Sequence, residues 1–203
     1  MNSSVLGHTL CSAPALWNYN VSHHGTVVAI VSDARALVGV DVVRLTDRPR
    51  RQTSVGEFFR AFAAHFHASE WEYIRGAAST EDEDGQYARF YRLWSLKEAY
   101  IKAVGVGLGF SLLRAEFVRA DARSEDRWEL MLDGERASEW HFTCSQVNAS
   151  HLVSVAYGPF SAMWKPETSS LFSPGQDIMR GRDIDDMEYP TRWEDWNLQD
   201  LLQ

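Results

Sequence analysis

One segment of the chain restricts the fold more than any other: a stripe of apolar residues at helical spacing that ends in three glycines. Between residues 86 and 104 large apolar side chains recur every three or four positions, which is the spacing of one buried helix face. The stripe consists of Phe90, Leu93, Leu96, Tyr100 and Val104. Glycine is common just after a helix, and Gly105, Gly107 and Gly109 follow. The sequence therefore predicts a helix over residues 86–104, packed on the core.

A second face of the same helix carries functional groups. Trp94, Glu98 and Lys102 are spaced four residues apart, so they lie above one another along one side of the helix. A carboxylate beside an ammonium group suits a site for a metal ion and a phosphorylated ligand. The alternative is an ordinary exposed pair of Glu98 and Lys102. Lys97 would either add positive charge to the site or be a surface lysine.

The glycine-rich loop after this helix also has two interpretations. Its backbone amides could cradle a phosphate group. The glycines could equally form a helix cap and a turn, which is the interpretation we favour.

Hydrophobic patterns on either side of the helix predict an α+β fold. Strands are expected over residues 17–21, 26–31, 36–45, 112–119, 128–132, 140–144 and 152–157, with a turn at residues 22–25. Two further helices are expected over residues 54–66 and 69–74, the second opened by a capping box at Ser69. Asp133 and Gly134 are a turn signal. This order of strands, helices and strands indicates an antiparallel sheet packed with helices.

Asp41 interrupts a strand that is otherwise apolar. Side chains alternate across a strand, so Gly39, Asp41 and Val43 should share one face, and the valines between them the other. Such an aspartate alone is usually a strand-end or turn residue. With Glu98 it would form a pair of carboxylates from two separate elements. Two carboxylates, ligand phosphates and waters make a typical shell for Mg²⁺.

Composition excludes several classes of protein. The net charge of −8 argues against nucleic acid as the main partner. No run approaches the roughly 20 apolar residues of a membrane span. Cys11 and Cys144 form no disulfide framework, and a cytosolic location is the simplest expectation. The sequence has no Walker-type run, no HExxH or CxxC and no Gly-x-Ser-x-Gly, so a P-loop, a zinc site and a serine hydrolase are not expected.

The composition changes near residue 161. Residues 161–203 carry nine acidic and four basic side chains, together with a stretch rich in serine and proline. This pattern predicts an acidic tail that is partly disordered or docked. An acidic scaffold that acts through this tail is one hypothesis for the function.

Three motifs together make the sequence resemble the 4'-phosphopantetheinyl transferase family. The family's Gly-[Ile/Val]-Asp strand is matched by residues 39–41, and its Trp-x-x-Lys-Glu-[Ala/Ser]-x-x-Lys helix by residues 94–102. A third mark, a Ser-His turn after a short strand, is matched by Asn-Tyr-Asn-Val-Ser-His at residues 18–23. The first motif is weak alone and the second is strong. All three occur in order and at family-like spacing, and the resemblance covers residues 17–157.

The resemblance implies a reaction and a set of site residues. The 4'-phosphopantetheine arm of coenzyme A would move to a serine of an acyl or peptidyl carrier protein domain, and adenosine 3',5'-bisphosphate would leave. The enzyme would be a Mg²⁺-dependent holo-[acyl-carrier-protein] synthase, with Asp41 and Glu98 as metal ligands and with Glu98 and Lys102 as catalytic residues. Coenzyme A would contact Asn20, Val21, Ser22, His23, Asp41, Glu98 and Lys102. His23 would lie near a nucleotide phosphate, and Lys97 is a weaker candidate.

Two departures from the family pattern matter. Some members carry a second acid two residues after the strand aspartate, where this chain has Val43. Single-chain members also have two similar halves with the active site between them, and the resemblance implies that most of the first half is absent here. We therefore expect a remnant of that half in residues 1–38, a complete half in residues 39–160 and the acidic tail in residues 161–203.

The missing half leaves a rival hypothesis and an expectation about association. A surface that normally lies between the halves would be an exposed apolar patch, through which copies of the chain could associate. The rival to the enzyme is a truncated, non-catalytic fragment that binds a carrier protein or a partner subunit.

Overall fold

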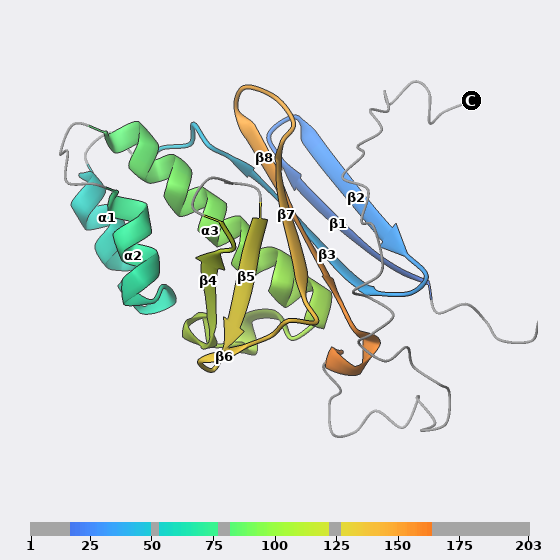
Figure 1. Ribbon diagram of the computed structural model, residues 1–203. Coiled ribbons are helices and arrows are strands. Elements are labelled where there is room, and N and C mark those ends of the chain that lie inside the picture. Colours follow the sequence, from blue (N-terminus) through green and yellow to red (C-terminus); the bar gives the residue numbers. More distant parts are fainter. Residues whose placement is uncertain (1–16, 50–52, 77–81, 122–126, 164–203) are drawn as a thin grey trace, which may run out of the picture.

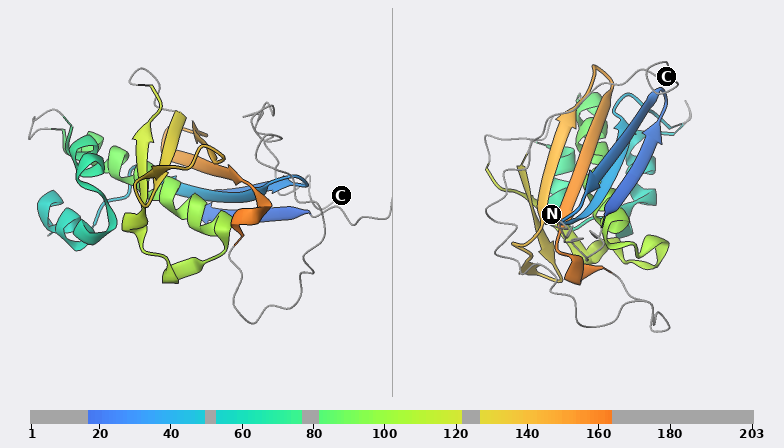
Figure 2. Two further views of the ribbon diagram at one scale, coloured as in Figure 1. Left: turned by 60° about the horizontal axis from the view of Figure 1, so that its bottom comes forward. Right: turned by 90° about the vertical axis from the view of Figure 1, so that its right-hand side faces the viewer.

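A six-stranded antiparallel sheet lies between one long helix and a two-stranded hairpin (Figure 1). The computed structural model describes residues 17–49, 53–76, 82–121 and 127–163. The two further views in Figure 2 show the layers of the molecule. The fold is α+β with an antiparallel sheet packed with helices, as the sequence predicts.

The strands and helices follow each other in the order that the hydrophobic patterns suggest. The strands are β1 (Asn18–His24), β2 (Val27–Asp33), β3 (Leu37–Arg44), β4 (Ala115–Arg119), β5 (Arg127–Leu132), β6 (Glu135–Arg136), β7 (His141–Gln146) and β8 (His151–Gly158). The helices are α1 (Val55–Ala61), α2 (Ala68–Arg75) and α3 (Glu83–Val104). The large sheet has the order β3-β8-β7-β5-β4, with β6 paired to β5, and the hairpin consists of β1 and β2. Strand β3 is therefore an edge strand.

Helix α3 is the centre of the fold. Asp82 caps its first turn by accepting a hydrogen bond from the Gly85 backbone, and Gly105 ends it in the left-handed conformation that glycine adopts easily (φ +80°). All five residues of the predicted apolar stripe are buried, so the predicted helix is confirmed, with a start three residues earlier. Residues on other sides of α3, such as Ser95, Ala99 and Ala103, are buried as well.

Gly39 lets strand β3 and helix α3 approach each other unusually closely. A Cβ atom at this position would overlap the carbonyl oxygen of Ala99 and lie 2.5 Å from the backbone nitrogen of Ala103. Any side chain larger than a hydrogen atom would therefore push the helix away from the strand. The small residues on α3 complete the close contact, which brings the next inward-facing residue of β3, Asp41, beside the helix.

The hairpin is attached to β3 by side chains of β1. Asn18, Asn20, Ser22 and His24 accept hydrogen bonds from the backbone nitrogens of Val38, Val40, Val42 and Arg44, at 3.0, 3.0, 3.2 and 3.3 Å. We call this set the β1 ladder. It pairs the backbone donors along the exposed edge of β3, which would otherwise lack partners.

The β1 ladder also explains an error in the predicted turn. The sequence predicted a turn at residues 22–25, but Ser22, His23 and His24 belong to β1, and the turn consists of Gly25 and Thr26. Gly25 has the positive φ (+58°) that such a turn favours. The polar character of residues 22–24 suggested a loop. Ser22 and His24 are polar because their side chains pair with the backbone at the edge of β3.

The two faces of the hairpin differ in their surroundings. Ala29, with Val27 and Val31, packs against valines of β3 and β8 on the sheet face turned away from α3. The outer face is exposed and apolar. It consists of Trp17 (67% exposed), Tyr19 (62%), Val21 (45%), Val28 (66%) and Ile30 (64%). We call these five residues the outer hairpin face.

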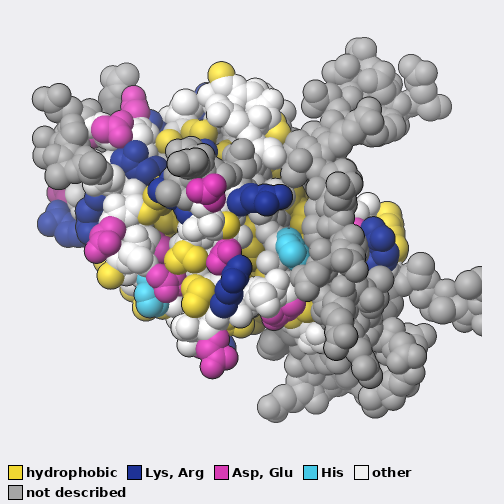
Figure 3. Space-filling view, in the orientation of Figure 1, with side chains coloured by type: hydrophobic (Ala, Val, Ile, Leu, Met, Phe, Trp, Pro, Cys, Tyr) yellow, Lys and Arg dark blue, Asp and Glu magenta, His cyan; other side chains and the backbone are white. Residues whose placement is uncertain are grey.

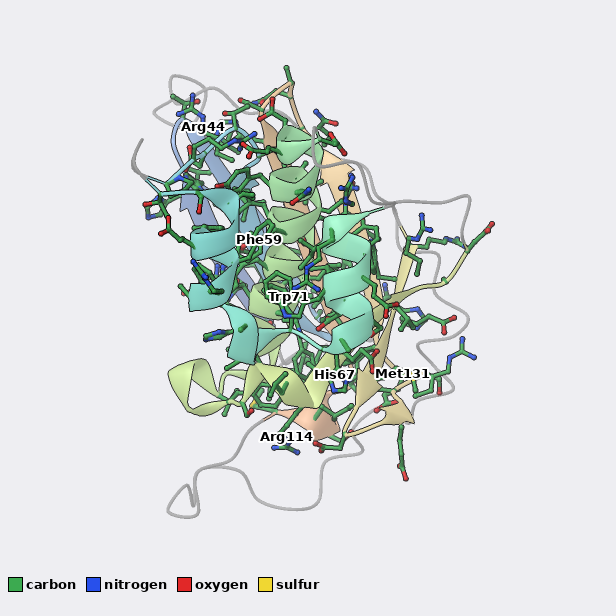
Figure 4. The ribbon with its side chains drawn as sticks, turned by 90° about the vertical axis from the view of Figure 1, so that its left-hand side faces the viewer. Arg44, Phe59, His67, Trp71, Arg114 and Met131 are labelled. Atoms are coloured by element: carbon green, nitrogen blue, oxygen red, sulfur yellow. The ribbon has the colours of Figure 1, made fainter. Side chains whose placement is uncertain are left out.

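Helices α1 and α2 pack on the first half of α3, with Phe59 and Trp71 between them (ring centroids 5.5 Å apart; Figure 4). The single helix predicted over residues 54–66 is wrong, because α1 ends at Ala61 and a separate 3₁₀ turn covers Ala63–His65. The predicted start of α2 is also wrong. Glu70, rather than an acid paired with Ser69, reaches back to a backbone nitrogen, that of His67, so the helix begins at Ala68.

Other predictions concern the second group of strands and the chain termini. The strand predicted over residues 112–119 is too long, since a 3₁₀ turn covers Leu112–Arg114 before β4. The turn at Asp133 and Gly134 is confirmed, with positive φ at both residues. Most of the tail, residues 164–203, lies outside the described residues, as do residues 1–16 of the N-terminal remnant. The boundary proposed after residue 38 falls within β3 and stays a prediction.

The close contact at Gly39 predicts a large effect of the smallest substitution. Gly39→Ala should lower the free energy of unfolding by about 1–3 kcal/mol, because the added methyl group overpacks the contact between β3 and α3. Urea denaturation followed by circular dichroism measures this change.

Gly56→Ala is the matched control. Gly56 lies within α1 and a Cβ atom there would meet nothing within 4 Å, so alanine should raise stability by up to about 1 kcal/mol. Equal stability of Gly39→Ala and the wild type would contradict the close contact.

Candidate active site

Asp41, Lys102 and Ser22 meet at one point where β1, β3 and α3 come together. The Lys102 ammonium nitrogen lies 2.7 Å from Asp41 Oδ1, and it also donates to Ser22 Oγ at 3.0 Å and to the Val40 carbonyl at 3.2 Å. Ser22 Oγ donates to Asp41 Oδ1 at 3.2 Å. These residues are separated by about 20 to 80 positions in sequence, so the fold alone brings them together.

Asp41 is nearly buried, with 7% of its surface exposed. Burial raises the pKa of its carboxyl group, and Lys102 and the hydroxyl of Ser22 oppose that increase. Ser95 also holds this part of β3, since its hydroxyl donates to the Asp41 carbonyl oxygen at 3.2 Å. Sequence analysis missed Ser95, although a serine on the buried side of an apolar helix is a signal that could have found it.

Glu98 is half-buried beside this cluster. Its pKa is raised, first by burial and then by the negative charge of Asp41, while Lys102 lowers it. The two carboxylates are therefore close enough to repel each other. The pairing of Asp41 and Glu98 as metal ligands stays a prediction, and Lys102 bonds to Asp41 rather than making a simple helical pair with Glu98.

Lys97 does not belong to this cluster. It is completely buried, and its ammonium group lies 2.9 Å from Glu70 Oε2 and donates to the carbonyl oxygens of Leu112 and Ala115. Burial lowers the pKa of Lys97 and raises that of Glu70, and the attraction between them opposes both shifts. The expectation of a surface lysine or a site cation is wrong. The error arises because α2 and the segment before β4 cover this side of α3.

Trp94 also lies apart from the cluster of Asp41, Lys102 and Ser22. Its ring packs in an aromatic cluster with Phe62, His65, Phe66 and Phe90, at centroid distances of 5.3 to 6.3 Å. The predicted helix face is real, but its first residue serves the core between α1 and α3. Glu98 and Lys102 supply the ionisable groups.

The residues of β1 divide between two faces. Asn20 and Ser22 face β3 as part of the β1 ladder, and Val21 and His23 point outward and are exposed. His24, which the sequence suggests as a possible neighbour of Val43 at the site, instead bonds to Asp47 at 2.8 Å through Nε2 and accepts from the Arg44 backbone through Nδ1. Val43 shares the inner face of β3 with Asp41 and is buried in the core, so it offers no oxygen to the site.

A model of the 4'-phosphopantetheinyl transferase superfamily matches residues 37–156 of the chain. The chain belongs to this superfamily. The matched segment contains Asp41, Glu98 and Lys102, together with the whole six-stranded sheet except the last two residues of β8.

Relatives of the chain carry names that agree with the superfamily. The human L-aminoadipate-semialdehyde dehydrogenase-phosphopantetheinyl transferase is 40% identical over 145 residues, which are 69% of this chain and 45% of the human protein. A phosphopantetheinyl transferase of Thraustochytrium sp. is 40% identical over 144 residues, 70% of this chain and 49% of that protein. The 4'-phosphopantetheinyl transferase pptA of Paxillus involutus is 31% identical over 146 residues, 67% and 52% of the two chains. The chain spans about half the length of these relatives.

The carboxylates of this superfamily member fit a magnesium ion. Mg²⁺ usually takes one or two protein carboxylates and completes its shell with substrate phosphates and water. Asp41 and Glu98 offer two hard oxygen ligands whose mutual repulsion a divalent cation would relieve. In the described ranges no three His, Cys, Asp or Glu side chains gather as a metal-binding group.

The remaining surface adds little to the site. A shallow depression of about 390 Å³ lies between α2 and the β5–β6 turn and is lined partly by His67, Arg114 and Met131 (Figure 4). It contains none of the candidate site residues. On the face seen in Figure 3, basic and acidic side chains are interspersed. None of the helices in the described part of the chain has the length and apolar character needed to cross a membrane.

The buried pair of Lys97 and Glu70 predicts a strong effect on stability. Lys97→Met should lower the free energy of unfolding by about 3–5 kcal/mol, because it leaves the Glu70 carboxylate buried without its partner. Glu70→Gln combined with Lys97→Met should recover part of this loss, since it removes the buried charge, while a single amide oxygen can accept from only one of the backbone nitrogens of His67 and Phe117, which donate to separate oxygens of Glu70. Urea denaturation at neutral pH measures all three proteins.

The deficit of Lys97→Met should also depend on pH. Removing Lys97 raises the pKa of Glu70 further, and a carboxyl group whose pKa is raised on folding stabilises the fold more at low pH than at high pH. The difference from the wild type should therefore shrink as the pH falls below neutrality. A deficit independent of pH would contradict the buried pair.

Proposed function

We propose that this chain is a Mg²⁺-dependent 4'-phosphopantetheinyl transferase. It would move the phosphopantetheine arm of coenzyme A to a serine of an acyl or peptidyl carrier protein domain and release adenosine 3',5'-bisphosphate. The observation that carries the proposal is the convergence of Asp41, Glu98 and Lys102 in a member of this superfamily. The chain matches about half of its relatives' length, so the activity of this chain itself is the proposal.

The chemistry requires positioning and charge stabilisation more than covalent catalysis. The serine oxygen attacks the phosphorus next to the pantetheine arm, a new oxygen–phosphorus bond forms, and the bond to the bridging pyrophosphate oxygen breaks. The electron pair of that bond leaves with adenosine 3',5'-bisphosphate. Enzymes accelerate such transfers mainly by holding the groups in line and by offsetting the charge that develops on the oxygens.

Asp41 and Glu98 would hold the Mg²⁺ ion, which supplies positive charge against the pyrophosphate when it is bound. Lys102 would bind the pyrophosphate and stabilise charge on the leaving oxygens. Its ammonium group is held by Asp41 and Ser22 and is partly exposed. An ammonium group held in this way can bind an anion without a large change of position.

Glu98 would accept the proton of the attacking serine, directly or through one water molecule. Its half-buried position leaves the carboxylate open to a substrate. Asp41, which is more deeply buried, is the less accessible of the two acids.

We further propose that Asn20, Val21, Ser22 and His23 line the coenzyme A site, with His23 near a nucleotide phosphate. Exposure of Val21 and His23 supports this role for the outward side of β1, whereas the side chains of Asn20 and Ser22 face β3. A cytosolic location and carrier protein domains as partners follow from the same proposal.

Removal of either carboxylate should abolish most of the transfer. Glu98→Gln should lower kcat by about 10²–10⁴-fold, because it removes a general base and a metal ligand, and Asp41→Asn should lower activity in the same direction. The assay follows the increase in mass of an apo carrier protein incubated with coenzyme A and Mg²⁺, and EDTA should stop it.

Glu135→Gln is the control, since Glu135 is an exposed acid on β6. It should transfer at the wild-type rate. No product from intact wild-type protein in the presence of Mg²⁺ would refute the enzyme and favour a fragment that binds a carrier protein without chemistry.

Copies of the chain should associate through the outer hairpin face, because five exposed apolar residues lie together there. Sedimentation equilibrium should show an association that depends on concentration. The double substitution Val28→Lys and Ile30→Lys should weaken it, whereas Leu113→Lys, at an exposed apolar position in the 3₁₀ turn before β4, should not. A monomer at every concentration would contradict this expectation.

A further inference from the structure

The hydroxyl group of Ser22 is unusual among the side chains of the β1 ladder. It is buried, and it bonds to three different groups: it accepts from the Val42 backbone at 3.2 Å and from Lys102 at 3.0 Å, and it donates to Asp41 at 3.2 Å. A serine hydroxyl has one donor hydrogen and two acceptor lone pairs. All three are used, so this arrangement leaves Ser22 Oγ no further hydrogen bond to offer a ligand.

The other ladder residues do not touch the candidate catalytic groups. Asn18 and Asn20 each accept one backbone hydrogen bond from β3. His24 accepts a hydrogen bond from the β3 backbone through one ring nitrogen and bonds to Asp47 through the other. The ladder repeats every second residue, and Ser22 is the position at which it passes Asp41. One buried hydroxyl thus links the hairpin, the edge of β3 and helix α3.

We propose that Ser22 is a positioning residue, whose hydroxyl fixes the Lys102 ammonium group against the Asp41 carboxylate in the geometry used for transfer. The part of this proposal that concerns transfer rests on the proposed function. Without the hydroxyl, Lys102 keeps a charged partner but loses the contact that sets its direction, and Asp41 loses a donor that holds its carboxylate. Loss of the Ser22 hydroxyl therefore changes both the attachment of the hairpin to β3 and the geometry of the site.

Kinetics separates this role from direct binding of coenzyme A. Ser22→Cys keeps the size of the side chain and replaces the hydroxyl with a weak donor and acceptor. We expect kcat to fall about 10- to 100-fold, as when an outer-shell partner of a metal ligand is removed, with KM for coenzyme A unchanged. Ser22→Thr keeps the hydroxyl and should restore kcat. A raised KM with kcat retained, or equal losses in the two variants, would overturn the proposal.

Asn18→Ala is the matched control, because it removes one bond of the β1 ladder without touching Asp41 or Lys102. It should lower the free energy of unfolding in urea but leave kcat near the wild-type value. A loss of kcat in Asn18→Ala as large as that in Ser22→Cys would mean that Ser22 acts only by attaching the hairpin, and would overturn the proposal.

A second measurement does not depend on activity. In nitrogen-15 spectra of lysine ammonium groups, Lys102 is assigned by the signal that disappears in Lys102→Met. A held ammonium group exchanges its protons slowly, so the signal should be present in the wild type and in Asn18→Ala and broadened or lost in Ser22→Cys. An unchanged signal in Ser22→Cys would overturn the positioning role even if the wild type transfers normally. Failure of transfer by the wild type would instead refute the proposed function and leave this result to decide the role of Ser22.

Discussion

The contact between β3 and α3 at Gly39 is the constraint on which the rest of the structure depends. It holds a strand backbone directly against Ala99 and Ala103, and the pleat of the strand then turns Asp41 toward the same helix. Glu98 and Lys102 directly precede these two alanines on α3. The site is therefore a consequence of backbone proximity.

Two polar arrangements keep that contact in register, and each involves buried charge. On one side, the β1 ladder accepts hydrogen bonds from the backbone nitrogens along the edge of β3. Ser22 of this ladder and Lys102 of α3 both donate hydrogen bonds to Asp41. On the other side Lys97 and Glu70 tie α2 and the segment before β4 to α3. Burying charged groups costs free energy unless every partner is present. Both arrangements therefore favour one position of α3 over positions shifted slightly from it.

Local patterns predict much of this fold, and long-range packing decides the rest. The α3 stripe, the alternation around Asp41 and the turn at Asp133 follow from periodicity and turn chemistry within a few residues. The errors at Ser22–His24 and at Lys97 share a different cause. Their surroundings come from β3 and α2, which are distant in sequence. A polar residue that pairs with a strand edge, or a lysine that pairs inside the core, looks in the sequence like a loop or surface residue.

The central claim is that the contact of β3 with α3 builds a metal-dependent nucleotide site. Calorimetric titration of coenzyme A into the protein, with and without Mg²⁺, tests this claim most directly. The account predicts that Mg²⁺ tightens the binding of coenzyme A to the wild type and that this gain disappears in Asp41→Asn and in Glu98→Gln. Binding of the same strength with and without Mg²⁺, or a gain that both variants retain, would contradict it.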